Sequence, residues 1–427
     1  MSRSLIVDHV ARIEGHAGIT VVLNGTGVER VEFDVDEGIR LFEGLLRGRP
    51  VADVPALVSR ICAICSHGHA ITASDAIERA LGVTVSPQTW ALRDLAFQGG
   101  AIESHALHVF CLALPDFLGH PGVVSLAGAD PATVALALRL KKLGNIVQEV
   151  VGGRAVHPVN YVIGGFGRLP SLDELLRVRD ALEAGRADCD DALAVLRTVP
   201  VPAFLREPIR CAALVPDGEA FFFGRRVRLS DGTEVAVDEY RSLTNERPVA
   251  HSHAKHSAHA GRSFMVGSLA RLTLNGDRIT GRAREAWAAL GLQTPSTNIV
   301  ANSVAQFVEL VYAVEHALEL VSRMIRDGLR GRPSADWSAR AGEGTAASEV
   351  PRGTLFHHYR VSADGVIAAA DVVTPTAENY GNLEDMLRAT VRDGISEPDA
   401  ELTRRLQVVA RAYDPCVSCS VHATRVI

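Results

Sequence analysis

Two short segments near opposite ends of the chain carry one pattern: Arg60-Ile61-Cys62-Ala63-Ile64-Cys65-Ser66-His67-Gly68-His69 and Asp414-Pro415-Cys416-Val417-Ser418-Cys419-Ser420-Val421-His422. Each segment holds two cysteines separated by two residues, so together they offer four thiolates. Four thiolates suit a soft or borderline metal: zinc, an iron–sulfur cluster, or nickel with iron. If both pairs serve one site, the two ends of the chain must meet in space. We therefore expect residues 1–427 to form a single domain rather than a string of independent ones.

The spacing of the two pairs does not by itself identify the metal. Zinc ribbons usually separate their pairs by roughly 15–20 residues, whereas almost the whole chain intervenes here. A thioredoxin-like redox pair would sit in a βαβ pattern, and neither segment does. A structural zinc site and a catalytic thiolate site both remain open at this point.

The pattern along the rest of the chain predicts a mainly α fold with β additions. Helical periodicity extends from residue 38 to about 111, with a break at Gly82 and Pro87. Further helices are predicted over residues 132–150, 171–196 and 298–326, with two more before the C-terminus, and strands or hairpins over 18–35, 226–237 and 354–372. We expect the long helices to form a central bundle, with the β hairpins packed at its ends.

Composition narrows the class of protein. The chain has 427 residues, of which 47% are hydrophobic, and it carries 44 basic against 50 acidic side chains. No basic stripe appears, so nucleic acid and anionic membrane surfaces are not expected partners. There is no signal-peptide apolar run and no apolar segment of the ~20 residues that a membrane span needs, which predicts a cytoplasmic protein. The odd count of seven cysteines argues against a disulfide framework.

The two cysteine segments resemble a known pair of signatures. They read R-x-C-x-x-C-x-x-x-H and D-P-C-x-x-C-x-x-H, and both resemble the nickel-binding motifs of nickel–iron hydrogenase large subunits. Other segments extend the likeness over nearly the whole chain, at residues 12–16, 42–49, 153–158, 266–271, 351–353 and 374–376, although Ser268 stands where proline is usual. Residues 104–108 and 115–117 look most like the cytoplasmic, multisubunit, cofactor-coupled branch. The resemblance implies the fold of such a large subunit and reversible cleavage of dihydrogen.

The resemblance also implies the ligands of the metal centre. Cys62, Cys65, Cys416 and Cys419 would hold nickel, and Cys65 and Cys419 would also bridge to an iron that carries carbon monoxide and two cyanides. Cys416 would receive the proton when dihydrogen is split, and Glu14 would relay it onward, because burial can bring a carboxyl pKa towards neutrality. The alternative for Glu14 is a salt bridge with Arg12.

Five further positions match residues around such a centre. Glu43 and His422 match ligands of a magnesium or iron ion. The alternative for Glu43 is a position on a solvent-exposed helix face, which is usual for a lone glutamate on a helix. Arg352 matches an arginine that overhangs the metals, unless it forms an ordinary ion pair. Pro375 and Thr376 match positions beside the diatomic ligands, with the Thr376 hydroxyl donating to a cyanide; Thr376 could equally lie at a hairpin end.

The remaining histidines and cysteines have weaker assignments. His67 could tune the sulfurs by a hydrogen bond, whereas His69 is expected to be a satisfied buried histidine. The His-rich run 251–259 could bind metal, but a solvated loop is the favoured interpretation. Cys111, Cys189 and Cys211 lack partner motifs and are expected to be small core residues.

The chain holds no further cysteines arranged as an electron relay and no G-x-G-x-x-G fingerprint. The resemblance therefore implies an iron–sulfur small subunit and flavin- or nicotinamide-handling subunits, which would carry the clusters, FAD and NAD(P); a deazaflavin is the next candidate acceptor. It also implies maturation proteins and an endopeptidase that removes residues 423–427, a hypothesis that intact mass showing Ile427 in nickel-loaded protein would refute. Two rival interpretations are a zinc-clasped scaffold and a quinone-site subunit of complex I. The latter family does not retain the four cysteines.

Overall fold

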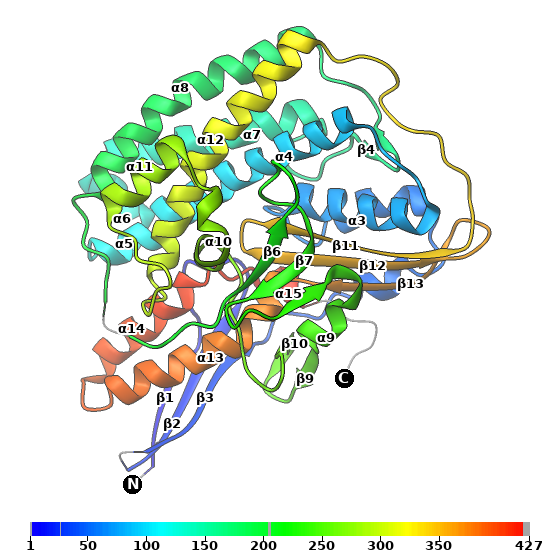
Figure 1. Ribbon diagram of the computed structural model, residues 1–427. Helices are drawn as coiled ribbons and strands as arrows, with labels where there is room; N and C mark the ends of the chain where they lie inside the picture. Colours follow the sequence, from blue (N-terminus) through cyan, green and yellow to red (C-terminus); the bar gives the residue numbers. More distant parts are fainter. Residues whose placement is uncertain (1, 26, 204–205, 422–427) are drawn as a thin grey trace.

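The computed structural model describes residues 2–25, 27–203 and 206–421 (Figure 1). The predictions for His422 and for a removable tail over 423–427 lie outside these residues. Among the described residues, no helix combines the length and the apolar run needed to cross a lipid bilayer.

Four long helices form the predicted bundle: α4 (Pro87–Ala106), α7 (Pro131–Gly152), α8 (Leu172–Leu196) and α12 (Ala301–Asp327) (Figure 1). Helix α4 contacts α7 and α12, and α8 contacts the same two. The α4–α7 contact is close because Gly144 brings the backbones together. A Cβ at Gly144 would lie 2.5 Å from the backbone of α4, so a larger residue would force the two helices apart.

The helix ends follow from the local sequence. Ser171 begins α8 with a capping box, because its hydroxyl accepts from the Glu174 N–H while the Glu174 carboxylate accepts from the Ser171 N–H. Ser86 caps α4 in the same sense by accepting from the Thr89 N–H. Such capping residues mark where a helix begins. Together with the apolar periodicity they allow the helices to be located from the sequence to within a few residues.

The shorter helices complete the α framework. They are α1 (Phe42–Leu46), α2 (Val54–Val58), α3 (Ser66–Leu81), α5 (Leu114–Phe117), α6 (Val123–Ala129), α9 (Tyr240–Thr244), α10 (Ser268–Asn275), α11 (Gly281–Leu290), α13 (Pro375–Asp393), α14 (Asp399–Ala412) and α15 (Val417–Ser420). A π-helical segment, Leu107–Ala113, continues α4 towards α5. The break predicted at Gly82 and Pro87 is confirmed, since α3 ends at Leu81 and α4 begins at Pro87.

The strands form small antiparallel sheets. The largest comprise β1 (Ser2–Val7), β2 (Ala17–Asn24) and β3 (Gly27–Val35); β6 (Ala212–Pro216), β7 (Gly224–Leu229) and β8 (Glu234–Ala236); and β11 (Gly342–Val350), β12 (Gly353–Val361) and β13 (Ile367–Val373). Two-stranded pairs are β4 (Tyr161–Val162) with β5 (Gly165–Phe166), and β9 (Arg247–Val249) with β10 (Ser252–His256). The predicted hairpins are confirmed, and β1, β6 and β11 each add a third strand.

Strand β11 was not predicted from the sequence. Its sheet lies directly against α3, as Figure 1 shows. A Cβ at Gly342 would meet the Ala80 carbonyl oxygen at 1.9 Å, and one at Gly344 would meet the Ala76 oxygen at 2.2 Å. The strand is built from small residues because a helix backbone packs on it. It therefore lacks the alternating β-branched residues by which a strand is predicted from sequence.

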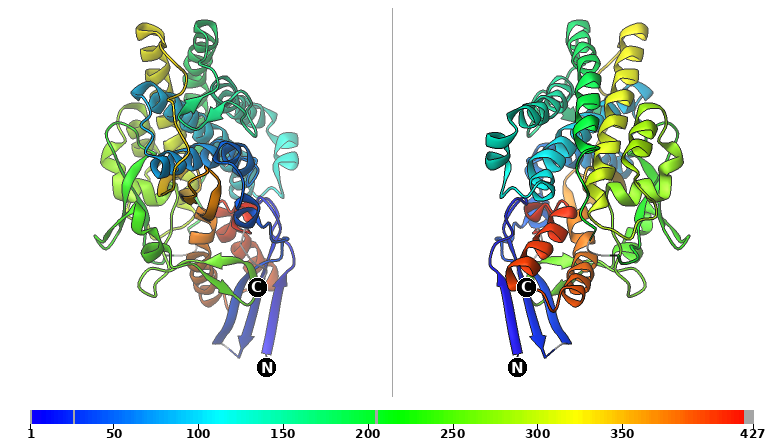
Figure 2. Two further views of the ribbon diagram at one scale, coloured as in Figure 1. Left: turned by 90° about the vertical axis from the view of Figure 1, so that its right-hand side faces the viewer. Right: turned by 90° about the vertical axis from the view of Figure 1, so that its left-hand side faces the viewer.

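Segments near the two ends of the chain meet beside the sheet of β11, β12 and β13. Glu14 and Cys416 form a parallel bridge, in which the Glu14 N–H donates to the Pro415 oxygen at 3.3 Å and the Val417 N–H donates to the Glu14 oxygen at 2.9 Å. Both views in Figure 2 place the C-terminal helices beside the N-terminal strands, and α13 and α14 contact β3 and β1 respectively. The topology therefore brings the two cysteine segments together.

A buried ion pair between α12 and α4 predicts a pH dependence of stability. His316 Nε2 lies 2.9 Å from Asp94 Oδ2. Burial opposes the charge on His316, but the Asp94 carboxylate outweighs it and raises the pKa of His316 above its usual value. The protonated pair therefore stabilises the fold below about pH 6.5, and this contribution is lost as the pH rises through the folded-state pKa.

We expect the native protein to lose unfolding free energy across that range, by less than the roughly 1.5–3 kcal/mol that a hydrogen bond to a charged group contributes, because neutral His316 can still donate to Asp94. In His316→Gln this loss should be absent. Denaturant midpoints measured at pH 6 and pH 9 test it, with exposed His253→Gln as the control. Equal pH slopes in native protein and His316→Gln would contradict the assignment.

Candidate metal centre

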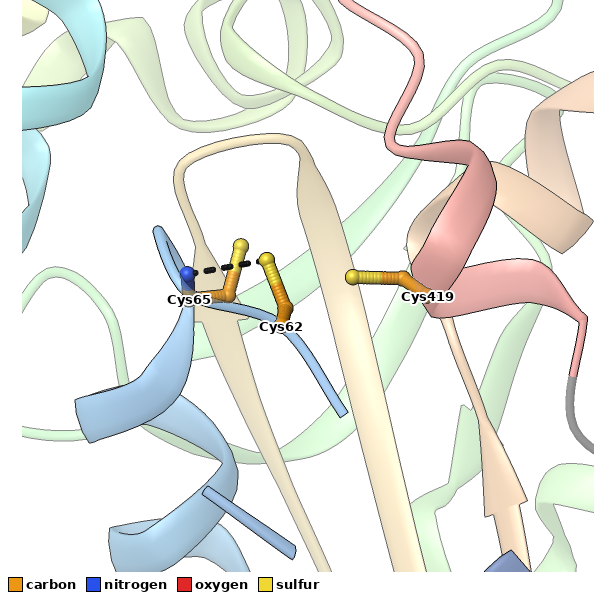
Figure 3. Close-up of side chains that lie close together, drawn as sticks. All are labelled: Cys62, Cys65 and Cys419. Carbon is orange, nitrogen blue, oxygen red and sulfur yellow. Dashed lines mark hydrogen bonds between the residues drawn. The ribbon is translucent and has the colours of Figure 1, made fainter. Parts of the chain in front are cut away.

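The four cysteines of the two segments converge on one buried point. Cys62 precedes α3 and Cys65 is its N-cap, while Cys416 is the N-cap of α15 and Cys419 lies within that helix. The Cys416 sulfur lies 3.3 Å from that of Cys62 and 2.7 Å from that of Cys419. Figure 3 shows Cys62, Cys65 and Cys419 directed towards one another, with sulfurs all within 4.8 Å. Each of the four is at most 4% exposed.

Local geometry holds each pair in place. The Cys65 N–H donates to the Cys62 sulfur at 3.2 Å (Figure 3). At the other end, the Cys419 N–H donates to the Cys416 carbonyl oxygen at 3.1 Å. Asp414 has a φ of +50°, a conformation that a residue with a short polar side chain adopts with least strain, and the chain turns there to enter the site.

The pKa values of the four buried thiols are shifted in opposite directions in the two cysteine pairs. Hydrogen bonds from Cys416 and Cys419 lower the pKa of Cys62 and of Cys65. Burial raises the pKa of Cys416 and of Cys419 well above its usual value. Four buried thiolates repel one another, and a bound metal ion would relieve that repulsion. The donor set therefore fits a soft or borderline metal.

Arg352 approaches the sulfurs from the turn between β11 and β12. Its Nη1 lies 3.5 Å from the Cys65 sulfur, while Nε donates to the Asp414 carbonyl oxygen at 2.8 Å and Nη2 donates to Asp414 Oδ1 at 3.0 Å. Burial opposes the charge, but Asp414 and the cysteine sulfurs outweigh it and raise the pKa of Arg352. The guanidinium is thus a fixed positive group beside the thiols, held by an ion pair as well as facing the site.

A second arginine holds the turn that carries Arg352. Arg271 is fully buried and donates to Glu309 Oε1 and Oε2 at 2.7 and 2.6 Å, and to Glu349 Oε2 at 2.9 Å. It also donates to the Pro351 carbonyl oxygen at 2.9 Å. Because Pro351 directly precedes Arg352, this network anchors the turn from which Arg352 extends.

Glu14 is bonded to the second cysteine segment through Ser418. Its Oε2 accepts from the Ser418 N–H at 3.1 Å, its Oε1 accepts from the Ser418 hydroxyl, and the residue is half-buried. Arg12 pairs with Asp116 instead. The alternative of an Arg12–Glu14 salt bridge is therefore wrong.

Thr376 and Pro375 lie in the first turn of α13, next to the second cysteine pair. The Thr376 hydroxyl oxygen accepts from the Cys416 N–H at 3.1 Å, and Pro375 occupies the first helical position. Thr376 is therefore inside the site and not at a hairpin end.

Glu43 is buried, with 3% of its surface exposed, and its Oε1 accepts from the Val372 N–H at 3.1 Å. The alternative of a solvated helix face is wrong. Whether Glu43 meets His422 falls outside the described residues.

His67 and His69 are both buried and bonded within the protein. The ring of His67 contacts the Tyr161 hydroxyl at 2.7 Å and the Arg154 and Ala155 carbonyl oxygens at 3.0 and 3.2 Å. Burial lowers its pKa to about 4. Both ring nitrogens are thus engaged away from the sulfurs, so a hydrogen bond from His67 to a thiolate has no support. His69 pairs with His357 at 3.1 Å.

Two predictions about the remaining residues have different outcomes. Cys111, Cys189 and Cys211 are buried apart from the cluster, and burial raises the pKa of each, as expected for core residues. The run 251–259 is not a solvated loop, because it forms β10 and buries His256.

Comparison with known proteins identifies the family. A family model described as nickel-dependent hydrogenase matches residues 40–148 and 227–422, more than half of the sequence, and spans both cysteine pairs. The chain belongs to the nickel-dependent hydrogenase family. The members of this family are oxidoreductases.

Individual hydrogenase subunits resemble the chain over nearly its full length. It is 34% identical over 422 residues to sulfhydrogenase 1 subunit alpha of Pyrococcus furiosus, covering 99% of this chain and 98% of that one. It is 29% identical to the NAD-reducing hydrogenase HoxS subunit beta of Cupriavidus necator, covering 99% and 95%. The crystal structure of an NAD+-reducing NiFe hydrogenase in its H2-reduced state superposes with a TM-score of 0.88 at 26% identity, covering 98% and 99%. The fold predicted from the sequence is confirmed.

Sequence analysis of this hydrogenase chain missed two residues of the centre. Asp414 binds Arg352 through both its side chain and its carbonyl group, and Ser418 binds Glu14 twice. Both lie inside the quoted C-terminal segment, so their position beside the cysteines was visible. Their partners were not, because they come from residues far away in the sequence.

Proposed function

We propose that this chain is the catalytic subunit of a nickel–iron hydrogenase, which cleaves dihydrogen reversibly into protons and electrons. The observation that carries the proposal is the convergence of four buried cysteines beside Arg352 in a chain of this family. A nickel–iron centre held by Cys62, Cys65, Cys416 and Cys419 would supply dihydrogen binding and heterolytic cleavage. Cys65 and Cys419 would also contact the iron.

The chain's own groups have defined roles in this proposal. Arg352 holds a fixed positive charge over the site, where it can donate to ligands of the iron. Cys416 receives the proton, and Glu14, bound to Ser418 two residues further on, carries it towards the surface. Thr376 orients Cys416 through the backbone N–H.

Further components follow from the same proposal. The iron would carry carbon monoxide and two cyanides beside Pro375 and Thr376, and Glu43 with His422 would bind a magnesium or iron ion. Relatives are named as subunits, alpha in one case and beta in another, which supports assembly with partner subunits. An iron–sulfur small subunit would take the electrons and pass them through a flavin-handling subunit to NAD(P) in the cytoplasm. The NAD-reducing relative supports this route. Maturation proteins and an endopeptidase acting on residues 423–427 would prepare the chain.

An infrared spectrum of protein purified from a host with the maturation machinery tests the proposal. We expect bands from metal-bound carbon monoxide and cyanide in protein that contains nickel and iron. Fully matured, folded protein with zinc alone and without these bands would overturn the catalytic function. The chain would then be a scaffold clasped by a metal.

Glu14→Gln tests the proton route. Glutamine can still accept from the Ser418 N–H, but it cannot carry a proton, and loss of a proton-transfer group typically costs about 100- to 10,000-fold. We expect dihydrogen oxidation, measured with an artificial dye acceptor, to fall by at least about 100-fold while the infrared bands persist. Glu37→Gln is a matched control, because Glu37 accepts from the His16 N–H nearby and contacts no cysteine. Near-native rates in Glu14→Gln would exclude Glu14 from the route.

A further inference from the structure

A second cluster of metal-binding side chains lies outside the cysteine centre. His251, His256 and Glu384 each offer one ligand atom, and these atoms all lie within 4.8 Å of one another. His256 lies on β10, His251 directly precedes that strand, and Glu384 lies on α13. Strand β10 contacts β3, α13 and α15, so the cluster sits where the N-terminal sheet meets the C-terminal helices (Figure 1).

The distances within the cluster suit a bound cation. His251 Nε2 lies 2.7 Å from Glu384 Oε1, and His256 Nδ1 lies 3.8 Å from Glu384 Oε2. The second distance is too long for a hydrogen bond. A tetrahedral zinc ion with bonds of about 2.0–2.2 Å separates its donors by roughly 3.4 Å. The two histidines and the carboxylate therefore need only small shifts to share one ion.

The surroundings prepare these groups as ligands. His256 is 3% exposed, its Nε2 is buried without a hydrogen-bond partner among the described residues, and burial favours the neutral imidazole that metals bind. His251 Nδ1 faces Glu32 Oε1 at 3.7 Å, which places a carboxylate behind the imidazole, as is usual for metal-binding histidines. The Phe33 N–H donates to Glu384 Oε1 at 2.9 Å and orients that carboxylate.

A cluster joined only by hydrogen bonds is the simpler alternative. It accounts for the His251–Glu384 contact, but it leaves His256 Nδ1 and Glu384 Oε2 at 3.8 Å with no bond between them. We propose that His251, His256 and Glu384 bind a divalent transition-metal ion of the zinc type, separate from the thiolate centre. Two nitrogens and one oxygen form a donor set that zinc accepts. This donor set differs from the four sulfurs of the cysteine centre.

The position of the site gives the ion a structural role. The ring of His256 lies 5.7 Å from that of Tyr380 on α13, and the Tyr380 hydroxyl is 2.8 Å from the Ser420 hydroxyl. An ion that joins β10 to α13 would therefore brace the segment that carries Cys416 and Cys419. The proposal does not depend on the hydrogenase function, because it rests on residues outside the cysteine cluster.

Zinc binding to the complete chain tests the proposal. Chelator-treated native protein, His256→Gln and His253→Gln are titrated with Zn2+, and the bound zinc is examined by X-ray absorption. His253 is the matched control, since it lies on the same strand but is exposed and faces the Glu37 carbonyl oxygen. We expect native protein and His253→Gln to bind, besides any zinc held by the cysteines, a zinc ion with nitrogen and oxygen ligands at about 2.0–2.2 Å, and His256→Gln to bind that ion at least about tenfold more weakly.

Two results would overturn the proposal. One is zinc with sulfur ligands alone, at about 2.3 Å, which would place the ion in the cysteine centre. The other is equal zinc affinity in native protein and His256→Gln. If His256→Gln does not fold, Glu384→Gln gives the same readout, because its amide oxygen can still accept from the Phe33 N–H. Equal affinity in that variant overturns the proposal in the same way.

Discussion

Replacing Cys416 by serine is expected to abolish the activation of dihydrogen and the assembly of the metal centre. The Cys416 sulfur is in contact with those of Cys62 and Cys419, and it is completely buried. A serine hydroxyl is a hard, protonated group that binds nickel poorly. Replacing a residue that only contacts a metal's ligands already lowers metal affinity or activity by roughly 10- to 100-fold. We therefore expect replacement of a ligand itself to lower activity by more than about 100-fold. Nickel content and dye-linked dihydrogen oxidation measure the effect.

Cys189→Ser is the matched control for this variant. Cys189 is a buried thiol on α8 and is not one of the four clustered cysteines. It should retain nickel and most of the activity, although burying a hydroxyl there will lower stability somewhat. Full nickel loading with native activity in Cys416→Ser would rule out Cys416 as both ligand and proton acceptor.

Replacing Arg271 by methionine is expected to produce the largest loss of stability. The side chain is fully buried between Glu309 and Glu349. Burial opposes the ionisation of Glu309, but Arg271 outweighs it and lowers the pKa of Glu309 to about 2. Removing one partner of a buried ion pair typically costs about 3–5 kcal/mol, because it leaves an uncompensated charge. We expect a loss of this size in the free energy of unfolding, measured by denaturant titration.

Arg282→Met separates this effect from the loss of any arginine. Arg282 pairs with Asp190 and Glu315 at the surface, where such pairs contribute about 0–1 kcal/mol. Activity adds a second readout, since Arg271 also binds the Pro351 carbonyl group and so sets the turn that carries Arg352. Equal destabilisation by the two substitutions would show that the buried network contributes no more than a surface pair.

The helices were predictable because their signals are local. Periodicity predicted residues 132–150 and 298–326, and the structure has Pro131–Gly152 and Ala301–Asp327. Strand β11 was not predicted, because it is made of small residues that allow the backbone of α3 to pack closely on it. Such residues do not give the alternating apolar pattern by which a strand is recognised. The burial of His256 was missed for a related reason. A polar run looks solvated until the sheet and helix that cover it are known.

The sequence by itself predicted a metal site built from thiolates, because two C-x-x-C pairs place sulfurs at a spacing that each short segment can realise alone. It also determined the family, through residues that flank those pairs. Only the tertiary structure decided which groups surround the sulfurs: Arg352 with Asp414, Glu14 with Ser418, and Thr376 with the Cys416 N–H. The same holds for the cluster of His251, His256 and Glu384. Contacts of this kind join segments that lie far apart in the chain, and they form only when buried surfaces pack, so no local pattern encodes them.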